Sequence, residues 1–126
     1  GETKEIPIYS LQTNRDEIFA PENIIGWEPV PAGTMATRAI IMNDDSMSGS
    51  RINKGDRVII REQETFTEGQ TVLVHLPDRS LMIRRATYTN DGIILSPDNS
   101  AYQPQHFKEK DIKIFGIVVQ VNFDYT

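Results

Sequence analysis

A serine preceded by two acidic residues follows an apolar run in the segment Met42-Asn43-Asp44-Asp45-Ser46-Met47. A hydroxyl at the end of a rigid strand stays reachable, as a serine nucleophile requires. Asp44 and Asp45 could in turn act as a general acid or hold a metal ion. A serine beside aspartate in a loop is more often a turn former, and adjacent carboxylates usually point apart into solvent. Ser46 alone is therefore only a candidate nucleophile.

The elements that must position this serine are short β-branched runs separated by Gly, Pro, Asn and Asp. They predict a mainly β fold with little helix, in which 71–87 and 81–96 form successive hairpins. Segment 11–27 predicts a loop with one short helical turn, and Pro31-Ala32-Gly33-Thr34 predicts a turn. The predicted strands are 6–9, 37–42, 57–61, 71–76, 81–87, 92–96 and 112–122.

Length and charge limit the function further. The 126 residues fit one domain, 1–126, and the start at Gly1 without an initiator Met indicates a piece of a longer protein. A net charge of −5 argues against direct binding of DNA by this piece. The absence of cysteine and of long apolar stretches predicts a cytoplasmic protein that does not enter a membrane. His75 and His106 lack a recognisable ligand spacing, so no metal and no cofactor are expected.

Several sequence blocks resemble one known family. Asp45-Ser46-Met47, with a Gly55-Asp56 turn nine residues after the serine, resembles the signature of the LexA, UmuD and phage-repressor peptidases. The resemblance implies their compact LexA-like, signal-peptidase-like β-fold of short antiparallel strands and hairpins. Further blocks resemble the family in order and spacing: 68–74, 80–86, 96–104 and 115–119.

In this family a serine attacks a peptide carbonyl, and a lysine kept neutral by burial removes the hydroxyl proton. The resemblance places Arg84 at the position of that lysine. A guanidinium stays protonated in proteins and cannot act as this base. His75 is an alternative base, because pairing of 71–76 with 81–86 through a four-residue loop would put His75 and Arg84 on one sheet face.

The expected cleavage site is also missing. Family repressors cut themselves at an Ala-Gly or Cys-Gly bond in a loop after the first strand, and 10–19 contains no such pair. Ala32-Gly33 lies close before the serine and is interpreted as a turn. Asp44 stands where the family has glycine, and its charge would oppose an oxyanion nearby. Arg79, Arg84 and Arg85 bind an acidic partner or, as we favour, neutralise Asp44 or Asp45.

The resemblance implies a bacterial or phage repressor that forms a homodimer and reads DNA through an N-terminal helix-turn-helix domain absent from this chain. We predict a dimerisation and regulatory domain that does not cleave itself. The dimer strand would be 115–123, whose Ile117, Val119, Val121 and Phe123 could supply an apolar face, although burial in the domain's own core explains part of that pattern. Two alternatives remain: a Ser46 self-cleaving peptidase with an unconventional base, and a sensor whose Ser46 and Arg84 bind a small acid.

Overall fold

The structure is a computed structural model that describes residues 1–11 and 18–123. Strands and single 3-10 turns form all of its regular secondary structure in those ranges, which confirms the mainly β fold. No helix in the same ranges is long and apolar enough to cross a membrane. The strands are β1 (Thr3–Ser10), β2 (Gly26–Pro31), β3 (Arg38–Ile41), β4 (Arg57–Glu62), β5 (Thr71–His75), β6 (Leu81–Thr89), β7 (Gly92–Ser96), β8 (Gln105–Phe107) and β9 (Lys113–Asn122). The 3-10 turns are Pro21–Asn23, Ser48–Ser50 and Glu109–Asp111.

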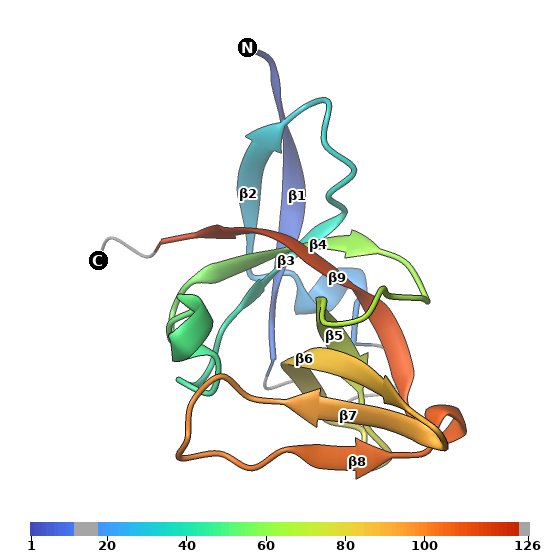
Figure 1. Cartoon of the computed structure of the whole chain (residues 1–126). Coiled ribbons are helices and arrows are strands. Elements are labelled where there is room, and N and C mark those ends of the chain that lie inside the picture. The colour runs from blue at the N-terminus through green and yellow to red at the C-terminus, as the bar shows by residue number, and fades with distance from the viewer. Residues whose placement is uncertain (12–17, 124–126) are drawn as a thin grey trace.

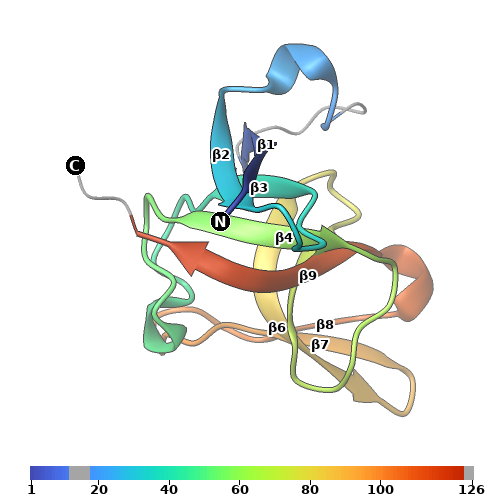
Figure 2. The same cartoon turned by 90° about the horizontal axis from the view of Figure 1, so that it is seen from above.

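The nine strands of the described residues join one mixed sheet in the order β2-β1-β3-β4-β9-β5-β6-β7-β8. The β1–β2 ribbon stands at one end of this sheet, and the β6–β7–β8 meander closes the other (Figure 1). Seen from above, β3, β4 and β9 lie side by side between these ends (Figure 2). Neighbouring strands pair antiparallel except β1 and β3, which are parallel. Strand β9, which pairs with β4 on one side and with β5 on the other, therefore connects the two ends of the sheet.

The structure contains two strands that the sequence pattern did not predict. β2 joins the end of the predicted loop 11–27 to the start of the predicted turn 31–34, and it carries Pro29 and Pro31. Proline lacks the N–H that a central strand needs, but β2 is an edge strand and pairs only with β1. β8 has only three residues, too few to show an alternating pattern.

The turns and hairpins follow the prediction more closely. The single helical turn expected in 11–27 is the 3-10 turn Pro21–Asn23. The predicted turn at 31–34 forms, with the Thr34 N–H donating to the Pro31 carbonyl at 3.0 Å. Strands β5, β6 and β7 pair as the two successive hairpins.

The largest apolar cluster fixes the serine loop to the sheet. Met42 and Met47, which flank the loop containing Ser46, pack in it with Ile83 of β6, and all three are at most 1% exposed. Burial of a methionine side chain stabilises a fold by roughly 1.5–3 kcal/mol. The loop on either side of the serine is therefore part of the core.

A bulge in β9 contradicts the single apolar face predicted for Ile117, Val119, Val121 and Phe123. Ile60 pairs with Val118 but Ile59 pairs with Gln120, so one residue of β9 is left out of the ladder. The extra residue reverses the alternation of side chains along the strand. Ile117 and Val121 consequently pack into different apolar clusters, whereas Val119 is 46% and Phe123 59% exposed.

Candidate active site around Ser46

Ser46 lies in a tightly held loop after β3. The Met42 N–H donates to the Asp56 carbonyl at 2.9 Å, and the Gly55 N–H donates to the Met42 carbonyl at 2.8 Å. Gly55 takes a φ of 93°, a backbone angle that glycine adopts without strain. This turn closes the loop against β4, and Ser46 inside it is fully buried.

The Ser46 hydroxyl is hydrogen-bonded on both sides. It donates to Oδ1 of Asp44 at 2.6 Å and accepts a hydrogen bond from Nη1 of Arg84 at 2.7 Å. The Ser46 backbone N–H donates to the same Asp44 oxygen at 3.0 Å. The hydroxyl proton is therefore directed at a carboxylate, and its oxygen lies against a cation.

Arg84 comes from β6 and is 6% exposed. Its Nη1 also donates to the carbonyl of Ile83 at 2.9 Å, and its guanidinium carbon lies 5.6 Å from the ring centroid of Tyr102. Burial lowers the pKa of the Arg84 guanidinium, and the negative charge of Asp44 opposes that shift. Because arginine stays protonated at neutral pH even so, Arg84 can donate to Ser46 but cannot take its proton.

The segment between β7 and β8, residues 97–104, holds the serine loop by hydrogen bonds. The backbone N–H of Asp98 donates to the Ser46 carbonyl at 2.9 Å, and the Gly49 N–H donates to the Asp98 carbonyl at 2.7 Å. A side chain at Gly49 would place its Cβ only 2.5 Å from that carbonyl oxygen, so the close approach requires glycine. The family resemblance includes this segment, but the sequence predicts no role for it.

Asp45 turns away from Asp44, toward the segment 97–104. It accepts a hydrogen bond from the Tyr102 hydroxyl at 2.8 Å, and its carbonyl accepts one from Nδ2 of Asn99 at 2.9 Å. The hydrogen bond to Asp45 raises the pKa of the Tyr102 hydroxyl. The two aspartates therefore have separate partners, and no group of three or more potential metal ligands occurs among residues 1–11 and 18–123.

The basic residues do not act as one group. Nη2 of Arg85 pairs with Oδ1 of Asp98 at 2.6 Å, so Arg85 does not neutralise Asp44 or Asp45 as predicted. This hydrogen bond lowers the pKa of Asp98 and raises that of Arg85. Arg79 lies in the β5–β6 loop with a φ of 71°. Among the three arginines, Arg84 is the one that contacts the serine.

The prediction that His75 shares a sheet face with Arg84 is wrong. His75 pairs with Leu81, and Val72 pairs with Arg84. The loop of this hairpin contains 76–80, one residue more than expected, and a slip of one residue turns a side chain to the other face. The His75 ring lies 5.7 Å from the ring of Phe115 instead.

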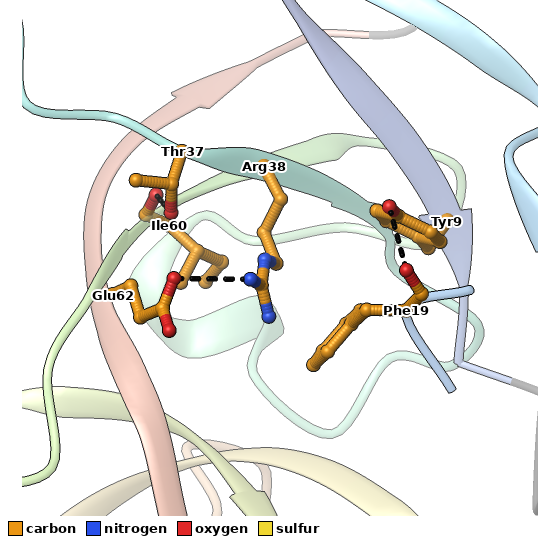
Figure 3. A network of polar contacts seen from close by, with 6 residues as sticks. All are labelled: Tyr9, Phe19, Thr37, Arg38, Ile60 and Glu62. Carbon is orange, nitrogen blue, oxygen red and sulfur yellow. Dashed lines mark hydrogen bonds and ion pairs between the residues drawn. The ribbon is translucent and has the colours of Figure 1, made fainter. Parts of the chain in front are cut away.

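The segment expected to contain a cleavage bond, 10–19, is described only at its ends, and 12–17 lie outside the described residues. Leu11 lines a cavity of about 70 Å³ that also borders Asp44 and Arg84. Figure 3 shows the other end, where the Tyr9 hydroxyl donates to the Phe19 carbonyl at 3.3 Å. The guanidinium of Arg38 covers the Phe19 ring at 3.7 Å and pairs with Glu62 at 3.1 Å.

The size of the cavity beside Arg84 bears on the small-acid alternative. At about 70 Å³ it is well below the roughly 300–1,000 Å³ typical of ligand pockets. Nη1 of Arg84 is already engaged by Ser46 and by the Ile83 carbonyl. The geometry therefore favours an internally satisfied site over a receptor for a free acid.

Comparisons with known proteins agree with this geometry. The family model for Peptidase S24-like domains matches residues 4–119. The LexA repressor of Exiguobacterium sibiricum is 30% identical over 119 residues, which are 92% of this chain and 57% of the relative. The LexA repressor of Oleidesulfovibrio alaskensis is 33% identical over 118 residues, or 90% of this chain and 56% of the relative.

A third relative, the LexA repressor of Geobacillus kaustophilus, is 32% identical over 120 residues, which are 92% of this chain and 57% of the relative. The chain thus spans just over half the length of these relatives. The family match over residues 4–119 covers nearly the whole chain. Within it, a buried serine lies next to the residue at the predicted base position. The chain belongs to the Peptidase S24-like family.

Proposed function

We propose that this chain is the dimerisation and regulatory domain of a transcriptional repressor, and that it does not cleave itself. The relatives it matches are LexA repressors, and the chain covers 57% of the first of them. DNA would be bound through a helix-turn-helix domain outside this chain, because a net charge of −5 does not suit phosphate binding. The homodimer would link two half-site contacts and so raise their combined affinity.

The observation that carries the loss of cleavage is the position of Arg84. Its Nη1 lies 2.7 Å from the Ser46 hydroxyl oxygen, which is where a base has to be to accept the serine proton. A group that is always protonated at this position cannot accept the serine proton, and its hydrogen bond occupies a lone pair of the serine oxygen. The alternative of an active peptidase would need a second base at the same oxygen, and the described partner on its other side is the weakly basic carboxylate of Asp44.

Loss of cleavage can be tested in cells with the full-length repressor. Because Ser46 performs no chemistry in this proposal, Ser46→Ala should leave the length of the protein unchanged through growth and stress. Immunoblotting with an antibody against the 1–126 segment measures the length. A shorter fragment present in the parent strain but absent from the Ser46→Ala strain would contradict the proposal.

Two exposed apolar side chains beside the β9 bulge support a dimer surface on that strand. Val119 is 46% and Met35 65% exposed, and both line a cavity of about 190 Å³ next to Ile59. Exposed apolar groups gathered at one place commonly mark a protein contact. We infer that this patch, with Phe123 beyond the end of β9, forms the centre of a two-fold interface.

The dimer is tested by sedimentation equilibrium of the chain and of Val119→Lys. A charge at the centre of the interface should raise the dimer dissociation constant at least ~10-fold, since central contacts are commonly worth more than ~1.4 kcal/mol. Ile25→Lys is the matched control, because Ile25 is 59% exposed but precedes β2 at the far edge of the sheet. Equal dissociation constants for the two variants would place the interface elsewhere.

A further inference from the structure

The Asp44 carboxylate lies directly against the nucleophile position, Ser46. One oxygen, Oδ1, accepts both the Ser46 hydroxyl proton at 2.6 Å and the Ser46 backbone N–H at 3.0 Å. In serine acyl transfer, the backbone N–H of the nucleophile is a common donor to the oxyanion that forms on the attacked carbonyl. The N–H that such an oxyanion would use at Ser46 is therefore already bonded to a carboxylate of the same chain.

We propose that Asp44 is a built-in anionic plug, which occupies the oxyanion position at Ser46 and blocks the site independently of Arg84. The proposal rests on the proposed loss of self-cleavage and adds a second cause to it. It implies that a lysine at position 84 alone does not restore a reactive serine. Both the plug and the arginine have to be removed.

The negative charge of Asp44 explains why replacing Arg84 by lysine does not by itself make Ser46 reactive. An anion close to an amine favours the protonated amine, and Asp44 already acts in this direction on Arg84. A lysine at 84 beside Asp44 would therefore be held as an ammonium ion and would offer no lone pair to the serine. Asp44 would also keep the hydroxyl proton and the backbone N–H of Ser46 engaged.

The surrounding contacts hold the plug in place. Asp45 is fixed by the Tyr102 hydroxyl at 2.8 Å and by Asn99 at 2.9 Å, and the Ser46 carbonyl is bonded by the Asp98 N–H at 2.9 Å. The backbone is thus anchored at the residue after Asp44 and again at Ser46. Removing the Asp44 side chain should free the two Ser46 donors without moving the loop.

The test uses the whole chain with a small alkyl fluorophosphonate as the probe. Its phosphorus bonds to the Ser46 oxygen, fluoride leaves, and the hydroxyl proton passes to the base at position 84. Five proteins are compared: the parent, Arg84→Lys, Asp44→Ala, the double variant Asp44→Ala/Arg84→Lys, and Ser46→Ala in the double background as the blank. Intact mass and peptide mapping measure the labelling rate at Ser46, and circular dichroism checks the fold.

We expect the double variant to be labelled at Ser46 at least ~10-fold faster than every other protein, with a rate that rises with pH, since general base catalysis contributes ~10²–10⁴-fold. Arg84→Lys labelled as fast as the double variant would overturn the plug. A folded double variant no faster than Arg84→Lys would overturn it as well. Fast labelling of the parent would instead refute the proposed loss of cleavage, so the two failures are distinguishable.

If the double variant does not fold, Asp44→Asn/Arg84→Lys decides the question. The amide keeps the shape of the aspartate but removes its charge, so the lysine should lose its proton at a lower pH than in Arg84→Lys. The pH midpoint of labelling measures this shift. Coincident pH profiles for the two lysine variants would overturn the proposal.

Discussion

Strand β6 contributes one residue to each of two hydrogen-bonded polar clusters. The serine cluster consists of Asp44, Ser46 and Arg84, and the surface cluster consists of Thr89, Asp91 and His106. By residue type the surface cluster is closer to a hydroxyl, imidazole and carboxylate triad. Its geometry is not, because the threonine hydroxyl and the aspartate both contact the same ring nitrogen of His106, at 3.2 and 3.3 Å.

Burial separates the two clusters further. His106 is 45% and Asp91 82% exposed, whereas Ser46 is fully buried and Arg84 is 6% exposed. Water competes for the bonds of the surface cluster, so its side chains are free to rearrange. The serine cluster is fixed by core packing and by backbone contacts. Residue type is therefore a weaker guide to a functional site than the structure that supports the residues. The loss of folding stability when a residue of each cluster is replaced should measure this difference.

The largest expected effect comes from the buried arginine. Arg84→Met should lower the free energy of unfolding by about 3 kcal/mol, because it leaves Asp44 without its nearby cation and Ser46 and the Ile83 carbonyl without a donor. Arg85→Met is the matched control: that side chain is 38% exposed, and its loss should cost less than about 1 kcal/mol. Urea unfolding followed by circular dichroism measures both. Equal losses would remove the distinction between buried and exposed arginine.

The serine and threonine hydroxyls give the next comparison. Ser46→Ala should cost about 1–2 kcal/mol, since it leaves buried partners without a hydrogen bond. Thr89→Ala removes a hydroxyl of the surface cluster and should stay within about 0.5 kcal/mol of the parent. Thermal and urea unfolding of the two alanine variants provide the measurement. A larger loss for Thr89→Ala would show that the surface cluster is the better supported of the two.

The smallest expected effect on folding stability concerns the ion pair between Asp98 and Arg85, which depends on pH. The hydrogen bond from Arg85 lowers the pKa of Asp98 below its ordinary value of 3.8. The stabilisation is therefore present above that value and is lost as the pH falls through the lower, folded pKa. Asp98→Asn should cost less than about 1 kcal/mol at neutral pH, because Arg85 is partly exposed, and almost nothing once the pH has fallen below the lowered pKa of Asp98.

A double-mutant cycle isolates the interaction between Asp98 and Arg85. In an Arg85→Met background, Asp98→Asn should have a smaller effect at neutral pH than it has in the parent, and its pH dependence should weaken. Urea unfolding at a series of pH values measures the coupling. An undiminished effect in that background would assign the shift to another partner, such as Ser50, which also donates to Asp98.

Sequence patterns predicted the strands of this fold better than the faces of its side chains. Seven runs with β-branched residues became strands, and the two missed strands were a proline-containing edge and a three-residue segment. Both errors of face have one cause, a shift of a single residue. The β5–β6 loop is one residue longer than expected, which turns His75 away from Arg84, and the β9 bulge separates Ile117 from Val121.

At the site, the nearness of Ser46 and Arg84 was implied by the family resemblance and not by their spacing in the sequence. The part of Asp44 in holding both Ser46 donors could not be predicted, because it depends on the direction of one side chain after a strand end. The contact follows a common local pattern. Asp44 precedes Ser46 by two residues, a spacing at which an aspartate often accepts a hydrogen bond from the backbone N–H of the later residue.

Intact-chain mass spectrometry of the proposed full-length repressor tests the central claim most directly. The protein, Ser46→Ala and Arg84→Lys are incubated for days at about pH 7 and about pH 10, because a lysine base would gain activity as it loses its proton. We predict that all three remain whole at both pH values, the first two for want of a base or a nucleophile and the third because Asp44 still occupies the site. Cleavage of the parent that Ser46→Ala abolishes would contradict the account.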